Sequence, residues 1–137
     1  MRAVESYIEG RWHQGADGIT VNHAVSGESI ATVSSAGINF AAAVEYARTV
    51  GGPRLRELTF HDRAGILRAL GKHILADTAA LYDISTATGA TRSDSWIDIE
   101  GGAGVLMAYS GIGRRKMPNA KVIIDGEPVS LSRDGSF

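Results

Sequence analysis

Residues 59–113 constrain the fold more than any other part of this sequence, because their pattern predicts consecutive amphipathic helices. Thr59 and Asp62 have the spacing of a capping box, which marks the start of a helix. Apolar residues then recur at helical spacing, at Phe60, Ala64, Leu67, Leu70 and Ile74. A stripe of this kind has to be covered, either by the rest of this chain or by protein outside it.

Further helices are expected before and after this one. The first occupies residues 39–50 and is expected to stop at Gly51-Gly52-Pro53, because proline lacks the amide donor that continues a helix. Another is expected to begin at an Asp77 cap and to close at Gly89, which suits a left-handed C-cap. A single bent helix across Asp77 is the alternative. Its inward residues are Ala80, Leu81, Ile84 and Ala87, while His61, Arg68 and Lys72 of the helix before it are expected to face solvent.

The last helix is expected to reach Gly113 and to be capped by Thr91 with Asp94 or by Ser95 with Asp98. Its apolar stripe comprises Trp96, Ile99, Ala103, Leu106, Met107 and Tyr109. Glycines at 101, 102, 104, 111 and 113 should each cost this helix about 1 kcal/mol relative to alanine. A helix tolerates this cost where the absence of side chains lets a neighbouring segment approach its backbone closely. We therefore expect this helix to be packed on more than one side.

The flanking sequences predict short strands. Residues 7–12 have the alternation of a hairpin around Gly10, anchored by Trp12, and strands are expected at 19–21 and 29–33, with a turn at Gly27 between them. Residues 121–124 and 129–131 predict a second hairpin around Asp125-Gly126, with Pro128 at its edge. We therefore expect one α/β domain over residues 1–137, with α+β character in isolation: 1–35 mainly β, 39–113 helical and 121–131 a β-hairpin.

Composition excludes several classes of function. A formal net charge of −1 over 137 residues gives no field that would attract nucleic acid or an anionic membrane. The absence of cysteine excludes disulfides, thiolate zinc sites and a cysteine nucleophile in this sequence. The first residues lack a basic region followed by an apolar run, so we expect a cytoplasmic protein. The longest uncharged run, residues 101–113, is shorter than the roughly 20 residues needed to span a bilayer.

Two glycine-containing runs could suggest a nucleotide site. Gly101-Gly102-Ala103-Gly104 has Met107 where the third glycine of the dinucleotide fingerprint belongs, and no strand is expected before it. The run from Gly111 to Lys116 ends a helix, whereas phosphate sites lie where helices begin. Close helix packing is therefore the preferred interpretation of both.

Charged clusters have structural explanations too. Asp94, Asp98 and Glu100 lie near the start of the last helix, where negatively charged side chains interact favourably with the positive end of the helix dipole. Arg114-Arg115-Lys116 complements its negative end, although the cluster could instead hold a phosphate of a nucleotide or of coenzyme A. The histidines, His13, His23, His61 and His73, lack metal-ligand spacing. The sequence thus assigns no catalytic, cofactor-binding or metal residue.

One further inference comes from the segments Tyr7-Ile8-Glu9-Gly10-Arg11-Trp12, Ser26-Gly27-Glu28, 41–48, 59–75 and Thr88-Gly89-Ala90-Thr91. Their order resembles the opening segment of an aldehyde dehydrogenase, in which a hairpin, a Thr-Gly-Glu turn and several helices precede the nucleotide-binding sheet. Ser26 replaces the usual threonine, and Ala90 replaces the lysine of the Thr-Gly-Lys element. Within the family, residues 41–52, 88–98 and the glycine-rich helix are most similar to the dehydrogenase half of the bifunctional phenylacetate ring-cleavage enzymes.

The resemblance implies a partial aldehyde dehydrogenase fold that lacks the nucleotide-binding sheet. The family oxidises aldehydes through a cysteine, with hydride passing to NAD(P), and its cysteine, glutamate base and asparagine lie downstream of the residues that match here. The resemblance therefore implies no cofactor in this chain alone. It also implies a partner, either the remainder of the dehydrogenase or another copy in a homo-oligomer.

Three hypotheses follow. The first is a catalytically silent N-terminal portion of an aldehyde dehydrogenase, arising from a truncated gene, a gene fragment or an excised piece. The second is a noncatalytic module that docks through its glycine-rich helix. The third is a small acyl-CoA or nucleotide binder that uses Arg114, Arg115 and Lys116.

Overall fold

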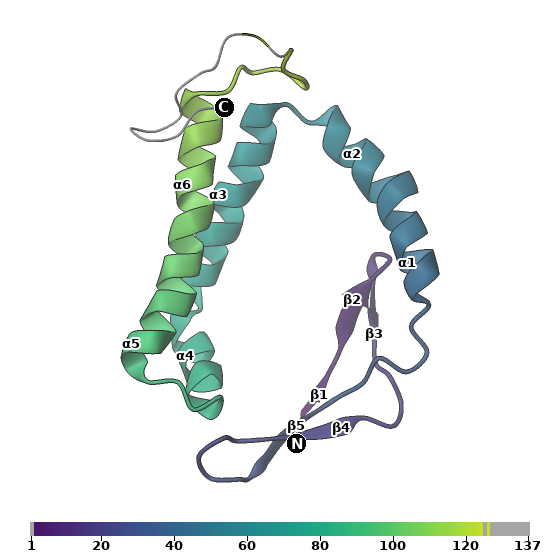
Figure 1. The fold of residues 1–137 in the computed structure, drawn as a ribbon, viewed down its shortest axis with the longest axis vertical. Helices are drawn as coiled ribbons and strands as arrows, with labels where there is room; N and C mark the ends of the chain where they lie inside the picture. Colours follow the sequence, from purple (N-terminus) through teal and green to yellow (C-terminus); the bar gives the residue numbers. More distant parts are fainter. Residues whose placement is uncertain (1, 125, 127–137) are drawn as a thin grey trace. The chain divides into compact units, whose positions relative to one another are not determined.

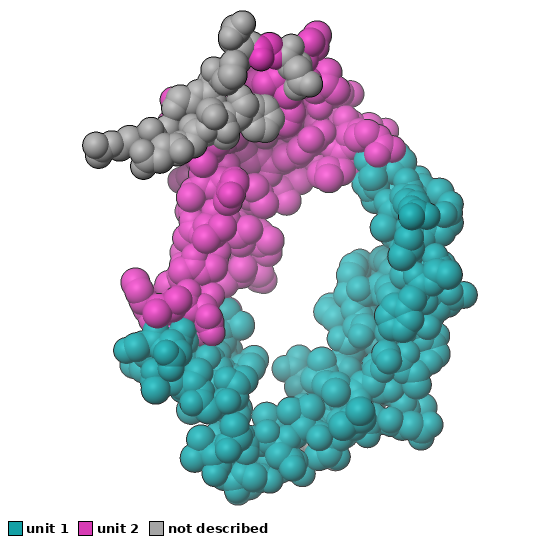
Figure 2. Space-filling view, in the orientation of Figure 1, with its two compact units in different colours: residues 1–53, 80–95 teal, residues 54–79, 96–137 magenta. Residues whose placement is uncertain are grey.

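The computed structural model describes residues 2–124 and 126 of the chain. It confirms the expected mixed α/β class, with two small sheets and a series of helices (Figure 1). Two compact units divide the chain: residues 1–53 with 80–95, and residues 54–79 with 96–137. Figure 2 colours these two units, which are called unit 1 and unit 2 below.

Unit 1 contains a three-stranded sheet. Its strands are β1 (Arg2–Val4), β4 (Ile19–Asn22) and β5 (Ser29–Val33), in the order β1-β5-β4. β4 and β5 pair antiparallel across the turn at Gly27, whose φ of +74° confirms the expected turn. Three residues are too few to show alternation, so the sequence pattern missed β1. Only its parallel pairing with the distant β5 makes it a strand.

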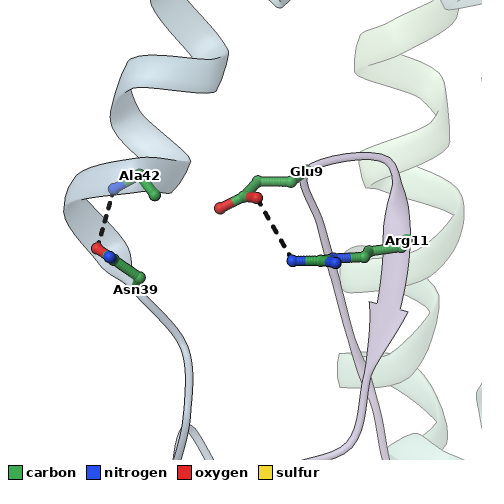
Figure 3. Close-up of polar contacts among 4 residues, drawn as sticks. All are labelled: Glu9, Arg11, Asn39 and Ala42. Atoms are coloured by element: carbon green, nitrogen blue, oxygen red, sulfur yellow. Dashed lines mark hydrogen bonds and ion pairs between the residues drawn. The ribbon is translucent and has the colours of Figure 1, made fainter.

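The expected N-terminal hairpin is present in unit 1. β2 (Ser6–Ile8) pairs antiparallel with β3 (Arg11–His13), and Glu9 and Gly10 both have positive φ, as a type I′ turn requires. The Tyr7 and Trp12 rings meet edge to face at 5.1 Å. Glu9 and Arg11 form an ion pair at 3.7 Å beside the turn (Figure 3). Trp12 packs against Tyr7 but is 66% exposed, so the expected anchor is not a buried residue.

The first helix is longer than expected. It begins as α1 (Phe40–Tyr46), where the Asn39 side chain accepts from the Ala42 amide at 3.0 Å (Figure 3). It then continues through a π-helical turn, η1 (Ala47–Gly51), into α2 (Gly52–Glu57), so the expected stop at Gly51-Gly52-Pro53 was wrong. In the wider π turn the amide of Gly52 bonds the carbonyl of Ala47. Pro53 then lies in the first turn of α2, where its missing donor costs little.

The second and third helices begin where the sequence indicates. α3 (Phe60–Ala76) has the complete capping box of Thr59 and Asp62. α4 (Thr78–Ala87) follows after the single residue Asp77, which is also the C-cap of α3. The chain leaves α4 through Gly89, whose φ of +89° confirms the left-handed conformation predicted there.

The last helix is continuous but contains a second π-helical turn. It comprises α5 (Arg92–Trp96), η2 (Ile97–Gly101) and α6 (Gly102–Arg115). Of the two caps considered, the pair Thr91 and Asp94 is the one formed, since the Asp94 amide donates to the Thr91 hydroxyl and the carboxylate of Asp94 accepts in return. The helix runs two residues beyond Gly113.

The core of unit 2 is the contact between α3 and α6, which lie side by side (Figure 1). Small residues make it: Ala64 and Gly71 on α3, and Ala103 and Ser110 on α6, are all buried. A Cβ added at Gly71 would lie 3.3 Å from the carbonyl oxygen of Ala103 and 3.2 Å from the Met107 sulfur. The two backbones therefore approach closely, and a glycine that the sequence pattern had not singled out permits it.

Several expected inward residues face outward instead. Trp96 and Tyr109 are 59% and 62% exposed, Leu70 and Ile84 are also exposed, and His61, expected in solvent, is half-buried. Among the glycines of the last helix, Gly113 meets another helix, at Ala64, while Gly101, Gly102 and Gly104 have nothing within 4 Å. Within the described part of unit 2, α6 therefore packs on one side, against α3.

The expected C-terminal hairpin is not confirmed. Residues 121–124 form no strand. Residues 129–131, their expected partners, lie outside the described residues. A strand exists only by pairing, so residues 121–124 remain an irregular segment.

The two capping boxes give one testable pH dependence. The hydroxyl of Thr59 and then its amide donate to Asp62 at 2.7 and 2.9 Å, and lower the pKa of that carboxyl; Thr91 lowers the pKa of Asp94 in the same way. Because these pKa values are depressed in the folded state, the stabilisation is complete above the unfolded aspartate value of about 4 and is lost as the pH falls through the folded values.

We therefore expect the helical circular dichroism of the chain to become more sensitive to urea as the pH falls below about 4. The double variant D62N/D94N should be less stable at neutral pH and should show a flatter acid dependence. D17N, at an exposed carboxylate that caps no helix, is the matched control and should leave the profile unchanged. Equal profiles for the wild-type chain and the double variant would contradict the assignment.

Candidate functional site

The acidic residues of the last helix lie along its N-terminal half. Asp94 is engaged by Thr91 in the cap, and Asp98 and Glu100 follow in the first turn of η2. Across residues 2–124 and 126, no cluster of three carboxylates or histidines could hold a metal ion. Asp94 therefore caps the helix start, whereas Asp98 and Glu100 lie further along the same helix.

The histidines lie apart and mostly serve the backbone. His13 bonds the carbonyl of Ala36 at 2.8 Å, and the ring of His23 accepts from the amides of the turn that follows it. His61 bonds the carbonyl of Met117 at 3.1 Å, while His73 is exposed in the last turn of α3. Their separation and these partners agree with structural roles.

The glycine run at 101–104 is not a phosphate loop. It lies where η2 passes into α6, so the helix continues through it and no strand precedes it. A phosphate site at a helix start depends on amides that the helix itself does not use. These amides lie inside a continuous helix, which excludes the dinucleotide fingerprint here.

The basic cluster lies at the C-terminal end of α6. Arg114, Arg115 and Lys116 are all exposed, and the Arg115 guanidinium lies back against Gly111 of its own helix. The negative end of the helix dipole stabilises these cations and disfavours a bound anion next to them. The position of the cluster agrees with an interaction between these cations and the helix dipole.

Several bonds between distant residues meet at the N-terminal end of α3. Arg63 donates from Nε to the carbonyl of Leu55 and from Nη2 to that of Lys121, at 3.1 and 3.4 Å, and its guanidinium lies 5.2 Å from the centre of the Phe60 ring. The Phe60 amide also donates to the carbonyl of Ala120 at 2.9 Å. These bonds hold α2 and residues 117–121 against α3.

An apolar groove of about 270 Å³ opens beside this network, between α3 and α6. Its lining includes Phe60, Ala64, Leu67, Tyr109, Ile112 and Met117. Arg63 is the charged side chain of this lining, and its Nε and Nη2 atoms donate to backbone carbonyls. The groove is therefore mainly apolar and can accept an apolar side chain. Sequence reasoning missed Arg63, and no local signal marks it, because its partners lie 8 and 58 residues away.

The helices expose much of their apolar surface. In the described chain, Ala64 and Ala103 are the only buried hydrophobic residues. Large apolar side chains remain exposed on each helix from α1 to α6. The last helix alone exposes Trp96, Ile97, Val105 and Tyr109. Exposure on this scale is unusual for a monomer and is typical of interaction surfaces.

Two buried serines of the last helix allow a matched prediction. Ser110 and Ser95 are both nearly inaccessible, but the Ser110 hydroxyl has no hydrogen-bond partner, whereas Ser95 bonds the Ser85 hydroxyl and the Thr91 carbonyl. An unsatisfied buried hydroxyl costs about 1–3 kcal/mol, and a satisfied one contributes about 1 kcal/mol. We expect S110A to raise and S95A to lower the free energy of unfolding, each by about 1 kcal/mol, in urea titrations. Destabilisation by S110A would mean that its hydroxyl has a partner.

Among the described residues, every helix is too short or too polar to cross a bilayer.

Comparison with known proteins finds a relative that is similar in sequence to nearly the whole of this chain. The chain is similar to an acyl-CoA semialdehyde dehydrogenase, which confirms the resemblance to aldehyde dehydrogenases. No family model matches the chain.

The relative is the 3,4-dehydroadipyl-CoA semialdehyde dehydrogenase of Aromatoleum evansii. It is 34% identical over 134 residues, which are 96% of this chain and 26% of the relative. The chain thus spans about a quarter of the length of the relative it matches. The matching part of this chain includes both units.

Proposed function

We propose that this chain is a noncatalytic segment of an NAD(P)-dependent aldehyde dehydrogenase that oxidises a CoA-linked semialdehyde in the cytoplasm, in the catabolism of an aromatic compound such as phenylacetate. Its role is to pack against the remainder of the enzyme or against another copy. The observation that carries the proposal is the 34% identity to a semialdehyde dehydrogenase over nearly the whole of this chain.

The burial pattern supports a packing role. Burying a side chain such as leucine, isoleucine or valine is worth about 1.5–3 kcal/mol, and this chain leaves many such residues exposed on its helices. Gly101, Gly102 and Gly104 leave the backbone of the last helix open to a close neighbour. A partner that covered these faces would recover the free energy that the helices do not recover among themselves.

The chemistry of the described residues supports catalysis elsewhere in the enzyme. The sequence contains no cysteine, Asp94 serves a cap, and His13 and His61 bond backbone carbonyls. Dehydrogenases that attack an aldehyde with a thiolate need a cysteine nucleophile. In this proposal that nucleophile, and the NAD(P) site, belong to the remainder of the enzyme.

The proposal is tested by a chimera. The matching 26% of the Aromatoleum evansii enzyme is replaced by this chain, and reduction of NAD(P) is followed with the relative's semialdehyde. We expect the chimera to turn over and the isolated chain to be inactive under the same conditions. A chimera with the core variant G71L should lose activity together with its folded structure, whereas one with G65L should keep both, because a side chain at Gly65 meets nothing within 4 Å.

The alternative functions are separated by two measurements. A small acyl-CoA or nucleotide binder predicts a saturable change in the fluorescence of Trp12 or Trp96 when NADP or coenzyme A is titrated into the isolated chain. A free-standing docking module predicts that the chimera is folded but inactive. Turnover by the isolated chain would overturn the proposal directly.

A further inference from the structure

We draw no further inference here: the strongest candidate, the outward face of the last helix with Gly101, Gly104 and Val105, belongs to the surface already assigned to packing, and nothing in the structure shows which segment covers it.

Discussion

Replacing Gly71 with leucine should destabilise unit 2 by about 1–3 kcal/mol, because added carbons overpack a contact that is already closed. A Cβ at this position would lie 3.2–3.3 Å from Met107 and from the Ala103 carbonyl oxygen, and that carbonyl belongs to helix backbone that cannot swing aside. The larger side chain would force α3 and α6 apart and expose Ala64 and Ala103. Urea titration followed by far-ultraviolet circular dichroism measures the loss.

The matched control is G65L, the same glycine-to-leucine substitution six residues earlier in the same helix. A side chain at Gly65 would meet nothing within 4 Å, so G65L should stabilise α3 by about 0.5–1 kcal/mol through helix propensity alone. The two variants should therefore shift the unfolding midpoint in opposite directions. Equal effects would show that α3 and α6 do not approach at Gly71.

The isolated chain should associate and should bind a hydrophobic dye, because its helices leave large apolar side chains in water. Val105 of α6 is 54% exposed and lies near the open backbone of Gly101 and Gly104. If this face is buried on association, V105E removes about 1.5–3 kcal/mol of burial, which weakens the association at least ~10-fold. Light scattering over a concentration series measures the shift.

The control for this prediction is V25E, which places the same charge on a 78% exposed valine in the turn of residues 24–28 of unit 1. It should leave both the scattering and the bound-dye fluorescence unchanged. A monomer with sharp thermal unfolding and no dye binding would contradict the prediction. Equal weakening by V105E and V25E would show that association does not use the face of the last helix.

The exposed apolar surface of the helices could be predicted from the sequence only in outline. Periodicity indicated that residues 59–113 carry more apolar surface than they can hide, and the exposed side chains agree. It placed Trp96 and Tyr109 inward, however, although both are exposed. The glycine at 71 carried a signal that could have been used, because it lies at the same helical spacing as Leu67 and Ile74. A small residue in that stripe marks where a neighbouring backbone approaches.

The first helix was predicted to end too early because the sequence does not reveal a π-helical turn. Gly51-Gly52-Pro53 is a strong stop signal in the sequence, but a π-helical turn places Pro53 where a helix tolerates it. The second π turn, η2, was also missed, although the helix that contains it was predicted. One extra residue in a turn leaves no trace in composition or periodicity over so short a span.

The sequence by itself determined several local features: the capping box at Thr59, the left-handed turns at Gly27 and Gly89, and the hairpin at Gly10. Each depends on hydrogen bonds or dihedral angles of residues within a few positions of one another, so the identities of neighbouring residues are enough to predict it. The tertiary structure alone decided that β1 pairs with β5 and that α6 presents Ala103 and Ser110 to α3. Those outcomes depend on how the surfaces of segments distant in the sequence pack together. Periodicity predicts which residues of a helix are apolar on one face, but not which segment covers them.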